Sequence, residues 1–586
     1  MPSPLQPDYR QHLELETPEQ VMLDYEVAGV GSRTLAAVAD WTIMTLLVVL
    51  AAAGLALWHG LSHWLFAIQI AVVYAIIWGY STGFEAFRRG QTPGKRWMGI
   101  RVIQETGGGV TFSEAAARNL LLPVDFIGMI GLILIAVHPR AKRLGDMVAG
   151  TVVVRDRPVE VPIVARATAA AGIADVELGA PVLSDADFQL LRGYIARAPS
   201  LPVAVRHRFA TQLAARFAHA RPVRATNDVD FLPELLEAEA ARRRGRFGAR
   251  GTTGSGQSVA ERLVARKGAR WQEFQVLADR VSRQGLDTLS ASELPDFAAR
   301  YREVAADLAR ARTYGADAAT LAQLERLAAA GHSALYRVDR QTWRRMWQLI
   351  SHDCPAAIIE SWRYVALAFL VFTVPALGGY ALLRDRPGLA AELIPDTMLE
   401  RAEAGAGREA HGQGYVLTPG EERPVMATSI IVNNVRVAFT CFAFGVVFGI
   451  GSLVALAYNG LELGAVSGHF ANAGLLGYLW TFVLGHGALE LFSIWVAGAA
   501  GFLLGRALIA PGELPRKDAL VLAGRRAMRM IGAVVVLLIV AGTIEGFISS
   551  SGLSLTGRAM VSGGSVVFLL VYLLNGARMA PTAPPA

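Results

Sequence analysis

The chain has 586 residues, of which 53% are hydrophobic and 18% are charged, and 56 Lys and Arg against 49 Asp and Glu give a net charge of +7. Soluble domains usually carry roughly 25% charged residues, so this composition excludes a disordered chain and argues against one large soluble enzyme. Apolar residues gather in stretches long enough, or nearly so, to cross a hydrocarbon layer about 30 Å thick. We therefore expect an all-α polytopic membrane protein with about eight transmembrane helices. The apolar stretches are residues 36–58, 64–82, 120–137, 364–383, 433–457, 475–508, 530–549 and 560–577.

Residues 1–20 form an expected amino-terminal tail, and two spans at 36–58 and 64–82 follow it, joined by a short connection around Gly60. The next connection, residues 83–119, is basic, which places it in the cytoplasm by the positive-inside rule. The amino terminus is then expected in the cytoplasm too. The basic side chains of this connection are Arg88, Arg89, Lys95, Arg96, Arg101 and Arg118.

A re-entrant helical hairpin is expected next. The apolar segment 120–137 is followed by further Arg and Lys residues, so a single crossing would place cytoplasmic-type charges outside. The β-branched runs GIRVI and GTVVVR flank the segment and predict a small β-hairpin near 99–155, which would keep both ends on one side. A capping box of Thr111 and Glu114 starts a helix, and Pro123 is expected to break it.

The middle of the chain has no segment that is apolar enough to cross a membrane, and its pattern predicts a cytosolic helical region. Residues 157–244 form a helical extension, with its first helices expected at 184–197 and 201–219. Residues 245–258 are rich in Gly, Ser and Arg, which is typical of a flexible linker. The following region, 259–360, predicts helices at 259–284, 291–312, 316–331 and 333–352.

A second membrane module is predicted at residues 361–578, followed by a tail at 579–586. The net acidic stretch 384–429 fits the outside, whereas the Arg-rich stretch 506–529 fits the cytoplasm. For both placements to hold, the chain must cross three times between them. The expected crossings are 433–457, the Gly-rich segment 461–485 and, after a break near His486, the segment ending at 508.

Three features of residues 21–156 carry a family resemblance. Arg33 and Asp40 lie at the start of the first span, and two motifs follow: TPGKRWMGIRV at Thr92–Val102 and RLGDMVAGTVVV at Arg143–Val154. In combination they resemble the RDD family of membrane proteins. The helical extension behind this domain is similar to one often found after RDD domains.

The second half of the chain carries its own motifs. They are YREVAADLARAR at Tyr301–Arg312, the pair Asn433 and Asn434 at the start of a span, GHGALE at Gly485–Glu490 and TIEGFIS at Thr543–Ser549. The region from the linker onward resembles the stage II sporulation protein M family.

The two resemblances imply a modest amount about function. RDD proteins resemble candidate transporters, some of them linked to cation–proton exchange, whereas the sporulation family resembles a membrane anchor for cell-wall remodelling complexes. A fusion implies that both modules act as one unit in a bacterial cytoplasmic (inner) membrane. Likeness at the level of the fold does not fix a function.

Ionisable residues inside apolar segments are the candidate site residues, because each costs at least ~2.5–3.5 kcal/mol at mid-bilayer and therefore faces a protein interior or water. Arg33 and Asp40 lie nearly two helical turns apart and share a face. They predict either a cation or proton site with an Arg counter-charge, or a structural ion pair that locks the first span to the cytoplasmic loop through Asp146 and Lys95. Asp125 predicts either an ion site on a broken helix or the cap of a second half-helix.

In the second module, His486 and Glu490 are spaced i, i+4 on one helix face, and Glu545 lies deep in a later span. The two carboxylates are expected either to carry a proton or to hydrogen-bond between helices. A His and Glu pair also suggests a metal ion, but the sequence nearby offers neither an H-E-x-x-H arrangement nor a third ligand, so no metal or other cofactor is expected. Asn433, Asn434 and Arg436 are expected near this cluster. The two asparagines are expected to hydrogen-bond between helices.

The sequence shows no nucleophile with a general base in a recognisable catalytic motif. A non-enzymatic function is therefore expected. The leading hypothesis is transport of a small ion or polar solute along a path lined by the intramembrane carboxylates of both modules. The alternative is a scaffold whose helical region 157–360 and loop 384–429 recruit cytosolic or cell-envelope partners. Nucleic acid is a poor fit. Small-residue spacing in the later spans permits close helix contact, within the chain or in a homodimer.

Overall fold

The computed structural model falls into two units, and each is described by itself. The first unit holds the described residues up to 155 and from 335 onward, and the second holds those from 182 to 334. The predicted linker 245–258 and the predicted tail 579–586 lie outside the described residues. The described residues are 12–16, 22–57, 62–155, 182–198, 203–220, 231–233, 235–236, 239, 259–284, 289–290, 292–313, 316, 318–335, 343–411, 418–483, 485–551 and 554–578.

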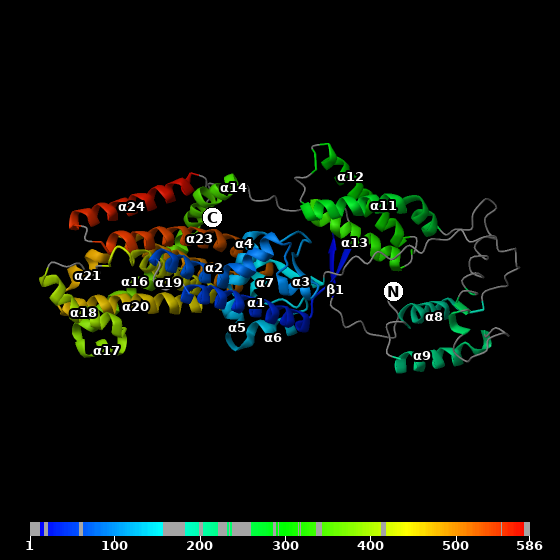
Figure 1. Ribbon diagram of the computed structural model, residues 1–586, viewed down its shortest axis with the longest axis horizontal. Helices are drawn as coiled ribbons and strands as arrows, with labels where there is room; N and C mark the ends of the chain where they lie inside the picture. Colours follow the sequence, from blue (N-terminus) through cyan, green and yellow to red (C-terminus); the bar gives the residue numbers. More distant parts are fainter. Residues whose placement is uncertain are drawn as a thin grey trace. The chain divides into compact units, whose positions relative to one another are not determined.

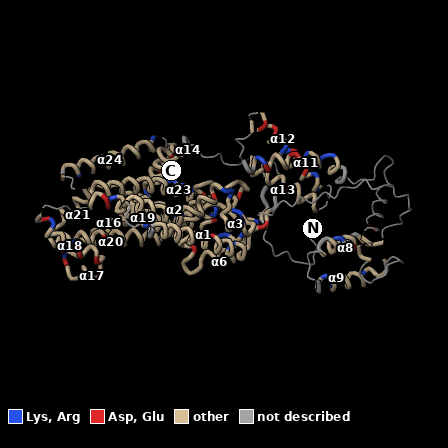
Figure 2. Tube along the Cα trace, viewed as in Figure 1, with Lys and Arg blue, Asp and Glu red and all other residues tan. Residues whose placement is uncertain are grey.

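Nine helices in the described part of the chain are long and apolar enough to cross a membrane, as the prediction of about eight spans plus a re-entrant hairpin requires. One of the nine is the kinked segment Phe112–Val137. The others are α1 (Val30–Leu57), α2 (His63–Phe87), α16 (Trp362–Asp385), α19 (Arg423–Ala443), α20 (Ile450–Asn472), α22 (Gly487–Ile509), α23 (Arg516–Thr543) and α24 (Leu555–Ala577) (Figure 1). In α16 and α24, charged residues occur only near the helix ends, and the central turns contain none (Figure 2).

Shorter elements complete the first unit. They are α3 (Pro93–Trp97), η1 (Ile127–Met129), α7 (Leu144–Ala149), α14 (Trp343–Gln348), η5 (Leu349–Asp353), α15 (Cys354–Glu360), η6 (Pro387–Leu389), α17 (Ala390–Leu393), α18 (Asp396–Ala410), η7 (Phe444–Val446), α21 (Leu476–Val483) and η8 (Ile544–Ser549).

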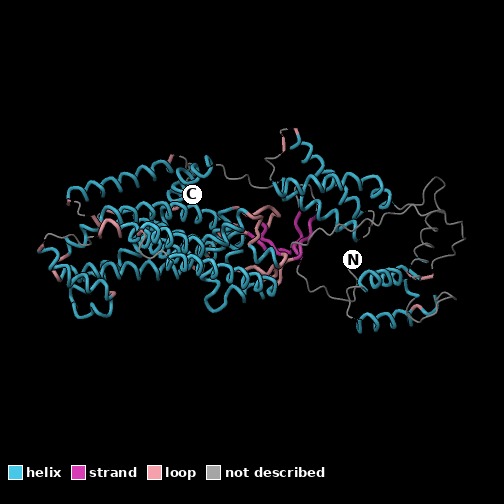
Figure 3. Tube along the Cα trace, in the orientation of Figure 1, coloured by secondary structure: helices cyan, strands magenta, loops and turns pink. Residues whose placement is uncertain are grey.

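A small antiparallel sheet ties the two ends of the re-entrant segment together. Strand β3 (Ile100–Gln104) pairs with β4 (Thr151–Arg155), with Ile100 opposite Arg155. The predicted pairing is confirmed, although helices rather than a tight turn join the strands. The residues between them therefore leave the sheet and return to it. The strands lie together at one end of the helices (Figure 3).

A second strand pair joins the expected amino-terminal tail, residues 1–20, to the start of the domain that we expected at 21–156. β1 (His12–Glu16) pairs antiparallel with β2 (Met22–Glu26), and Val27 continues to a bridge with Val154. The sequence signal was the alternation of apolar and acidic residues in HLELE and MLDYE, which is typical of a half-buried strand. Leu13 is 2% exposed, so the apolar face is covered.

The re-entrant segment folds as three short helices: α4 (Phe112–Leu120), α5 (Leu122–Phe126) and α6 (Ile130–Val137). Gly128 and Met129 both have left-handed backbone conformations, with φ of 56° and 58°, and the chain reverses there. A Cβ atom on Gly131 would lie 2.7 Å from the Cβ of Asp125, so α6 folds back close to α5. The helix that Thr111 caps ends at Leu120, just before Pro123 in the first turn of α5, as predicted; the chain reversal follows five residues after Pro123.

The predicted span 433–457 is wrong. The chain turns in the middle of it, at Phe448 and Gly449, whose φ angles are 53° and 79°. Helix α19 therefore begins at Arg423, and the next crossing is α20 rather than 461–485. The sequence did not reveal the turn, because its residues are apolar. Just before the turn, the backbone at Gly445 packs directly on Gly501 of α22, and a Cβ atom on Gly445 would lie 2.2 Å from the Gly501 Cα.

Helices α16 and α20 pack in parallel through three glycines spaced four residues apart. Such spacing lets two backbones approach closely. Added Cβ atoms would lie 2.1, 1.8 and 2.7 Å from carbonyl oxygens of α16 for Gly460 against Phe372, Gly464 against Ala376 and Gly468 against Tyr380. The glycines that suggested close helix contact in the sequence also pack within the chain, so their spacing does not call for a homodimer; these are Gly445, Gly498, Gly501 and Gly505.

The two membrane modules contact each other. The rings of Trp78 on α2 and Phe439 on α19 lie 5.3 Å apart. On the α7 side, Gly524 of α23 faces Val148, whose carbonyl oxygen would lie 2.6 Å from an added Cβ. The modules therefore form one packed body.

In the second unit, the predicted helices at 184–197, 201–219, 259–284, 291–312 and 316–331 are confirmed with small shifts. Phe217, Phe231 and Leu191 form one buried cluster, and Phe274 packs on Phe297, with ring centroids 5.4 Å apart. The predicted helix 333–352 is described in part: residues 333–335 form the end of α13, and α14 begins at Trp343. The helices of this unit are α8 (Asp185–Arg197), α9 (Val203–Arg216), η3 (Ala218–Ala220), α11 (Val259–Gln284), α12 (Glu293–Thr313) and α13 (Ala318–Leu335).

We expect Gly464→Ala to lower the thermal unfolding midpoint of the detergent-solubilised protein. The new Cβ would overlap the Ala376 carbonyl, and overpacking of this kind typically costs about 1–3 kcal/mol. Gly378→Ala on α16 is the matched control, because nothing lies within 4 Å of a Cβ there. Equal midpoints for the two variants would contradict the close α16–α20 contact.

Candidate functional site

Asp146 on α7 is the centre of a buried ion-pair network in the first module. Its side chain is fully buried, Arg118 on α4 binds one carboxylate oxygen at 2.8 Å, and Arg33 on α1 binds the other at 2.5 Å. Burial alone would raise the pKa of this carboxyl, but Arg118, Arg33 and Arg143 together hold it well below its usual range. Asp146 therefore stays ionised across the physiological pH range.

Glu85 at the end of α2 is a second fully buried carboxylate, and sequence analysis missed it. Arg118 lies 3.1 Å from one of its oxygens, Asn119 donates to the same oxygen at 3.1 Å, and Lys95 pairs with the other. Burial lowers the pKa of Lys95 to about 8, although Glu85 opposes this shift. The available signal was Glu85 itself, an acidic residue directly after an apolar span.

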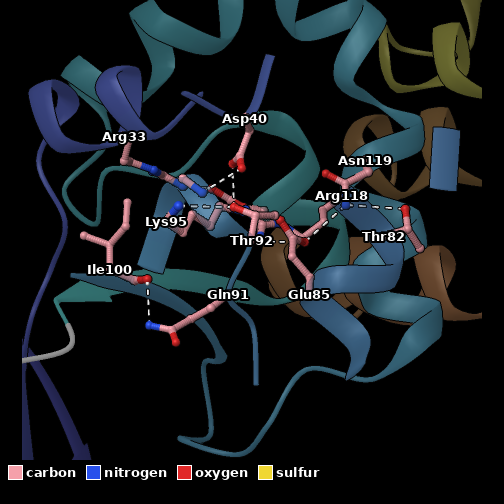
Figure 4. Close-up of polar contacts among 12 residues, drawn as sticks. Arg33, Asp40, Thr82, Glu85, Gln91, Thr92, Lys95, Ile100, Arg118 and Asn119 are labelled. Atoms are coloured by element: carbon pink, nitrogen blue, oxygen red, sulfur yellow. Dashed lines mark hydrogen bonds and ion pairs between the residues drawn. The ribbon is translucent and has the colours of Figure 1, made fainter. Parts of the chain in front are cut away.

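Asp40 does not pair with Arg33, so the expected Arg counter-charge is wrong. The Asp40 carboxylate instead accepts hydrogen bonds from Tyr80 Oη at 3.0 Å, Thr92 Oγ1 at 2.5 Å and the backbone N–H of Gly94 at 2.8 Å. Gly94 must lack a side chain, because a Cβ would lie 2.3 Å from the Ala36 carbonyl oxygen. Asp40 thus fixes the start of α3 against α1 (Figure 4).

Asp125 caps a helix, but a different one from that expected. Its Oδ1 accepts a hydrogen bond from the backbone N–H of Leu144 at the start of α7, at 3.2 Å. Its Oδ2 lies 3.6 Å from the guanidinium of Arg143. The carboxylate therefore joins the hairpin to α7 rather than starting α6.

Ion pairs in this network join four cations to three carboxylates, and Asp40 lies beside it with hydrogen-bond donors instead of a cation. Removing charges from water is costly, and one uncompensated member would be strongly destabilising. The network therefore fixes α1, α2, α3, α4 and α7 in one arrangement. Its members are Arg33, Lys95, Arg118 and Arg143 with Glu85, Asp125 and Asp146.

The second cluster lies at the break between α21 and α22. His486 Nε2 lies 3.8 Å from a Glu490 oxygen and 3.6 Å from a Glu545 oxygen. The expectation that no third metal ligand lies nearby is wrong. Glu545, in η8, lies beside His486 and Glu490, although it follows Glu490 by 55 residues in the chain. The three ligand atoms lie within 4.8 Å of one another.

The polar residues of α19 take different places. Asn434 is 9% exposed, and its side chain hydrogen-bonds Glu490. Arg436 is exposed and donates to Asn433 Oδ1 at 3.0 Å. Only Asn434 therefore belongs to the cluster with His486.

The candidate residues form two clusters rather than one. Arg525 of α23 lies 3.5 Å from Glu114 of α4, beside the first network. Glu545 follows it by twenty residues on the same helical run, which corresponds to about 30 Å at 1.5 Å per residue. The clusters therefore lie at opposite ends of α23, roughly the thickness of a hydrocarbon layer apart.

Comparison with known families identifies both membrane modules. Residues 27–150 match the RDD family, and residues 368–550 match Stage II sporulation protein M. The helices at 261–337 match a separate domain of unknown function. No curated protein and no solved structure matches the chain. The chain is thus a fusion of an RDD family domain and a Stage II sporulation protein M domain.

We expect Asp146→Asn to lose about 3–5 kcal/mol of unfolding free energy at pH 7, because Arg33 and Arg118 would lose their shared counter-charge. The folded-state pKa of Asp146 lies below the unfolded value of about 3.9, so its contribution is complete above that value and is lost as the pH falls below it. Thermal unfolding midpoints should therefore differ by a constant amount from pH 7 to about 5, and the difference should narrow progressively as the pH falls below about 4.

Asp385→Asn serves as the control, since the Asp385 side chain is 80% exposed and should leave the midpoint unchanged. A gap between Asp146→Asn and the parent that does not narrow in acid would contradict the ion-pair assignment.

Proposed function

We propose that this protein is a non-enzymatic membrane scaffold of a bacterial cytoplasmic membrane, with both termini in the cytoplasm. The supporting observation is that the four buried carboxylates Asp40, Glu85, Asp125 and Asp146 each have a cation or a set of hydrogen-bond donors within the protein. Side chains paired in this way stabilise an arrangement of helices rather than line a path.

Surfaces suited to partners lie on the second unit and on the α18 side of the first. In the second unit, a cleft of about 310 Å³ between α11 and α12 is lined by Arg270, Arg300 and Glu303 above the buried rings of Trp271 and Phe274. Charged rims around an apolar floor are typical of protein-binding surfaces. The anchoring role that the sporulation family resemblance implies is consistent with such recruitment.

The α18 region offers a second recruitment surface. Leu383, Ile394 and Ala402 bury this region against Phe470 and Leu475, so it is a folded cap rather than a loose loop. Glu400 and Glu403 of α18 remain exposed. The described part of the acidic stretch that we expected outside the membrane, residues 384–411 and 418–429, therefore includes a packed helix with exposed acidic side chains.

Movement of an ion or proton is the second candidate function. One observation favours it: Glu490 and Glu545 have His486 as their ion-pair partner, and their side chains are 24% and 14% exposed. Carboxylates without Arg or Lys could exchange a cation or proton with the surroundings.

Site-specific photo-crosslinking in cells tests the scaffold. A photoreactive residue at Glu400 or at Val276, which is 65% exposed on α11, should form defined adducts with other proteins. The same residue at Val374, which is 64% exposed on the span α16, is the control and should form none.

Proteoliposomes carrying ion- and pH-sensitive dyes test the alternative. The scaffold predicts no flux of H⁺, Na⁺, K⁺ or Mg²⁺ above that of empty vesicles. A flux that Glu490→Gln abolishes and Glu462→Gln preserves, together with the absence of protein adducts at both crosslinking positions, would establish transport instead.

A further inference from the structure

The ring of His486 is held in a single orientation with one nitrogen facing two carboxylates. The side chain is 97% buried (3% exposed), and its Nδ1 lies 3.2 Å from Ser549 Oγ. The neighbouring Gly485 carbonyl accepts a hydrogen bond from Ser565 at 3.0 Å, which fixes the backbone at the break. Nε2 is thereby directed toward Glu490 and Glu545, at distances longer than hydrogen bonds.

The surroundings do not neutralise the two carboxylates. In the described parts of the chain, no Lys or Arg lies within ion-pair distance of Glu490 or Glu545; Arg401 acts on Glu545 only from farther away. Two like charges close together in apolar surroundings repel each other strongly. A cation or protons must therefore accompany them.

We propose that His486, Glu490 and Glu545 bind one divalent transition-metal ion of the Zn²⁺ class. One imidazole nitrogen and two carboxylate oxygens are three of the ligands that Zn²⁺ takes in open sites, with water as the fourth. Ligand atoms within 4.8 Å of one another can close on an ion at bond lengths of about 2.0–2.2 Å with small side-chain movements. Mg²⁺ fits poorly, because it requires octahedral oxygen ligands.

The outer shell of the site is already in place. Ser549 holds Nδ1 of the ligating histidine, and Asn434 hydrogen-bonds Glu490, which are the roles that outer-shell groups play around metals. Glu545 lies in the π-helical segment η8, and such segments occur frequently at functional sites. Both carboxylates are partly exposed at the surface of the protein, by 24% for Glu490 and 14% for Glu545. The ion would join the start of α22 to the end of α23, whether the protein is a scaffold or a transporter.

Metal analysis of the full-length protein, purified in detergent without a polyhistidine tag, tests the site. After removal of metal with a chelator, dialysis against Zn²⁺ should load one ion per chain and raise the thermal unfolding midpoint, whereas Mg²⁺ at the same concentration should do neither. Glu545→Gln and His486→Gln should abolish stoichiometric loading. Ser549→Ala should weaken Zn²⁺ binding by roughly 10–100-fold, as loss of an outer-shell partner does.

Glu462→Gln is the matched control, because Glu462 is a partly buried carboxylate on α20 outside the cluster; it should load Zn²⁺ as the parent does. The midpoint of each metal-free variant shows whether it folds, and Ser549→Ala gives an independent result if a ligand variant does not. Failure of the parent to bind Zn²⁺, or equal loading of the parent, Glu545→Gln and His486→Gln, would overturn the proposal.

Discussion

The buried Asp146 carboxylate is the constraint on which the first membrane module depends. An isolated charge cannot remain inside a protein without large cost, so the carboxylate requires Arg33 from α1 and Arg118 from α4 at the same time. Arg118 in turn binds Glu85 of α2, and Glu85 binds Lys95 of α3. Helices α1, α2, α3, α4 and α7 are therefore connected by successive ion pairs. Each buried charge in this series is stabilised by the opposite charge beside it.

The same constraint reaches the second module through direct packing. Helices α4 and α7 carry the ion pairs, and both also contact α23, through Arg525 with Glu114 and Gly524 with Val148. Because α23 and η8 form one continuous helical run, the position of Glu545 depends on the helix that the first module contacts. This arrangement explains in physical terms how a fusion of two families can act as one body.

The two polar clusters solve the problem of buried charge differently. The first pairs Glu85, Asp125 and Asp146 with Arg and Lys, which suits a structural role. The second offers its two carboxylates a histidine and the side chain of Asn434 but no Arg or Lys among the described residues, so its charge must be met by a proton or a metal ion. The two clusters therefore differ in their counter-charges rather than in the number of their carboxylates.

Sequence alone determined the membrane class, the two families, the pairing of the β-branched runs and the helices of the second unit, because hydropathy, local motifs and helical periodicity are properties of neighbouring residues. It identified Asp40, Asp125, Asp146, Glu490 and Glu545 as unusual, and it offered Asp146 and Lys95 as one of two possible sets of partners for the first span. Only the tertiary structure decided that Arg33 pairs with Asp146 rather than with Asp40, that Glu85 joins Lys95 to Arg118 and that Glu545 joins His486, since these contacts depend on how separate helices pack. It also decided where α19 ends, because an apolar turn packed on a glycine of α22 carries no polar signal in the sequence.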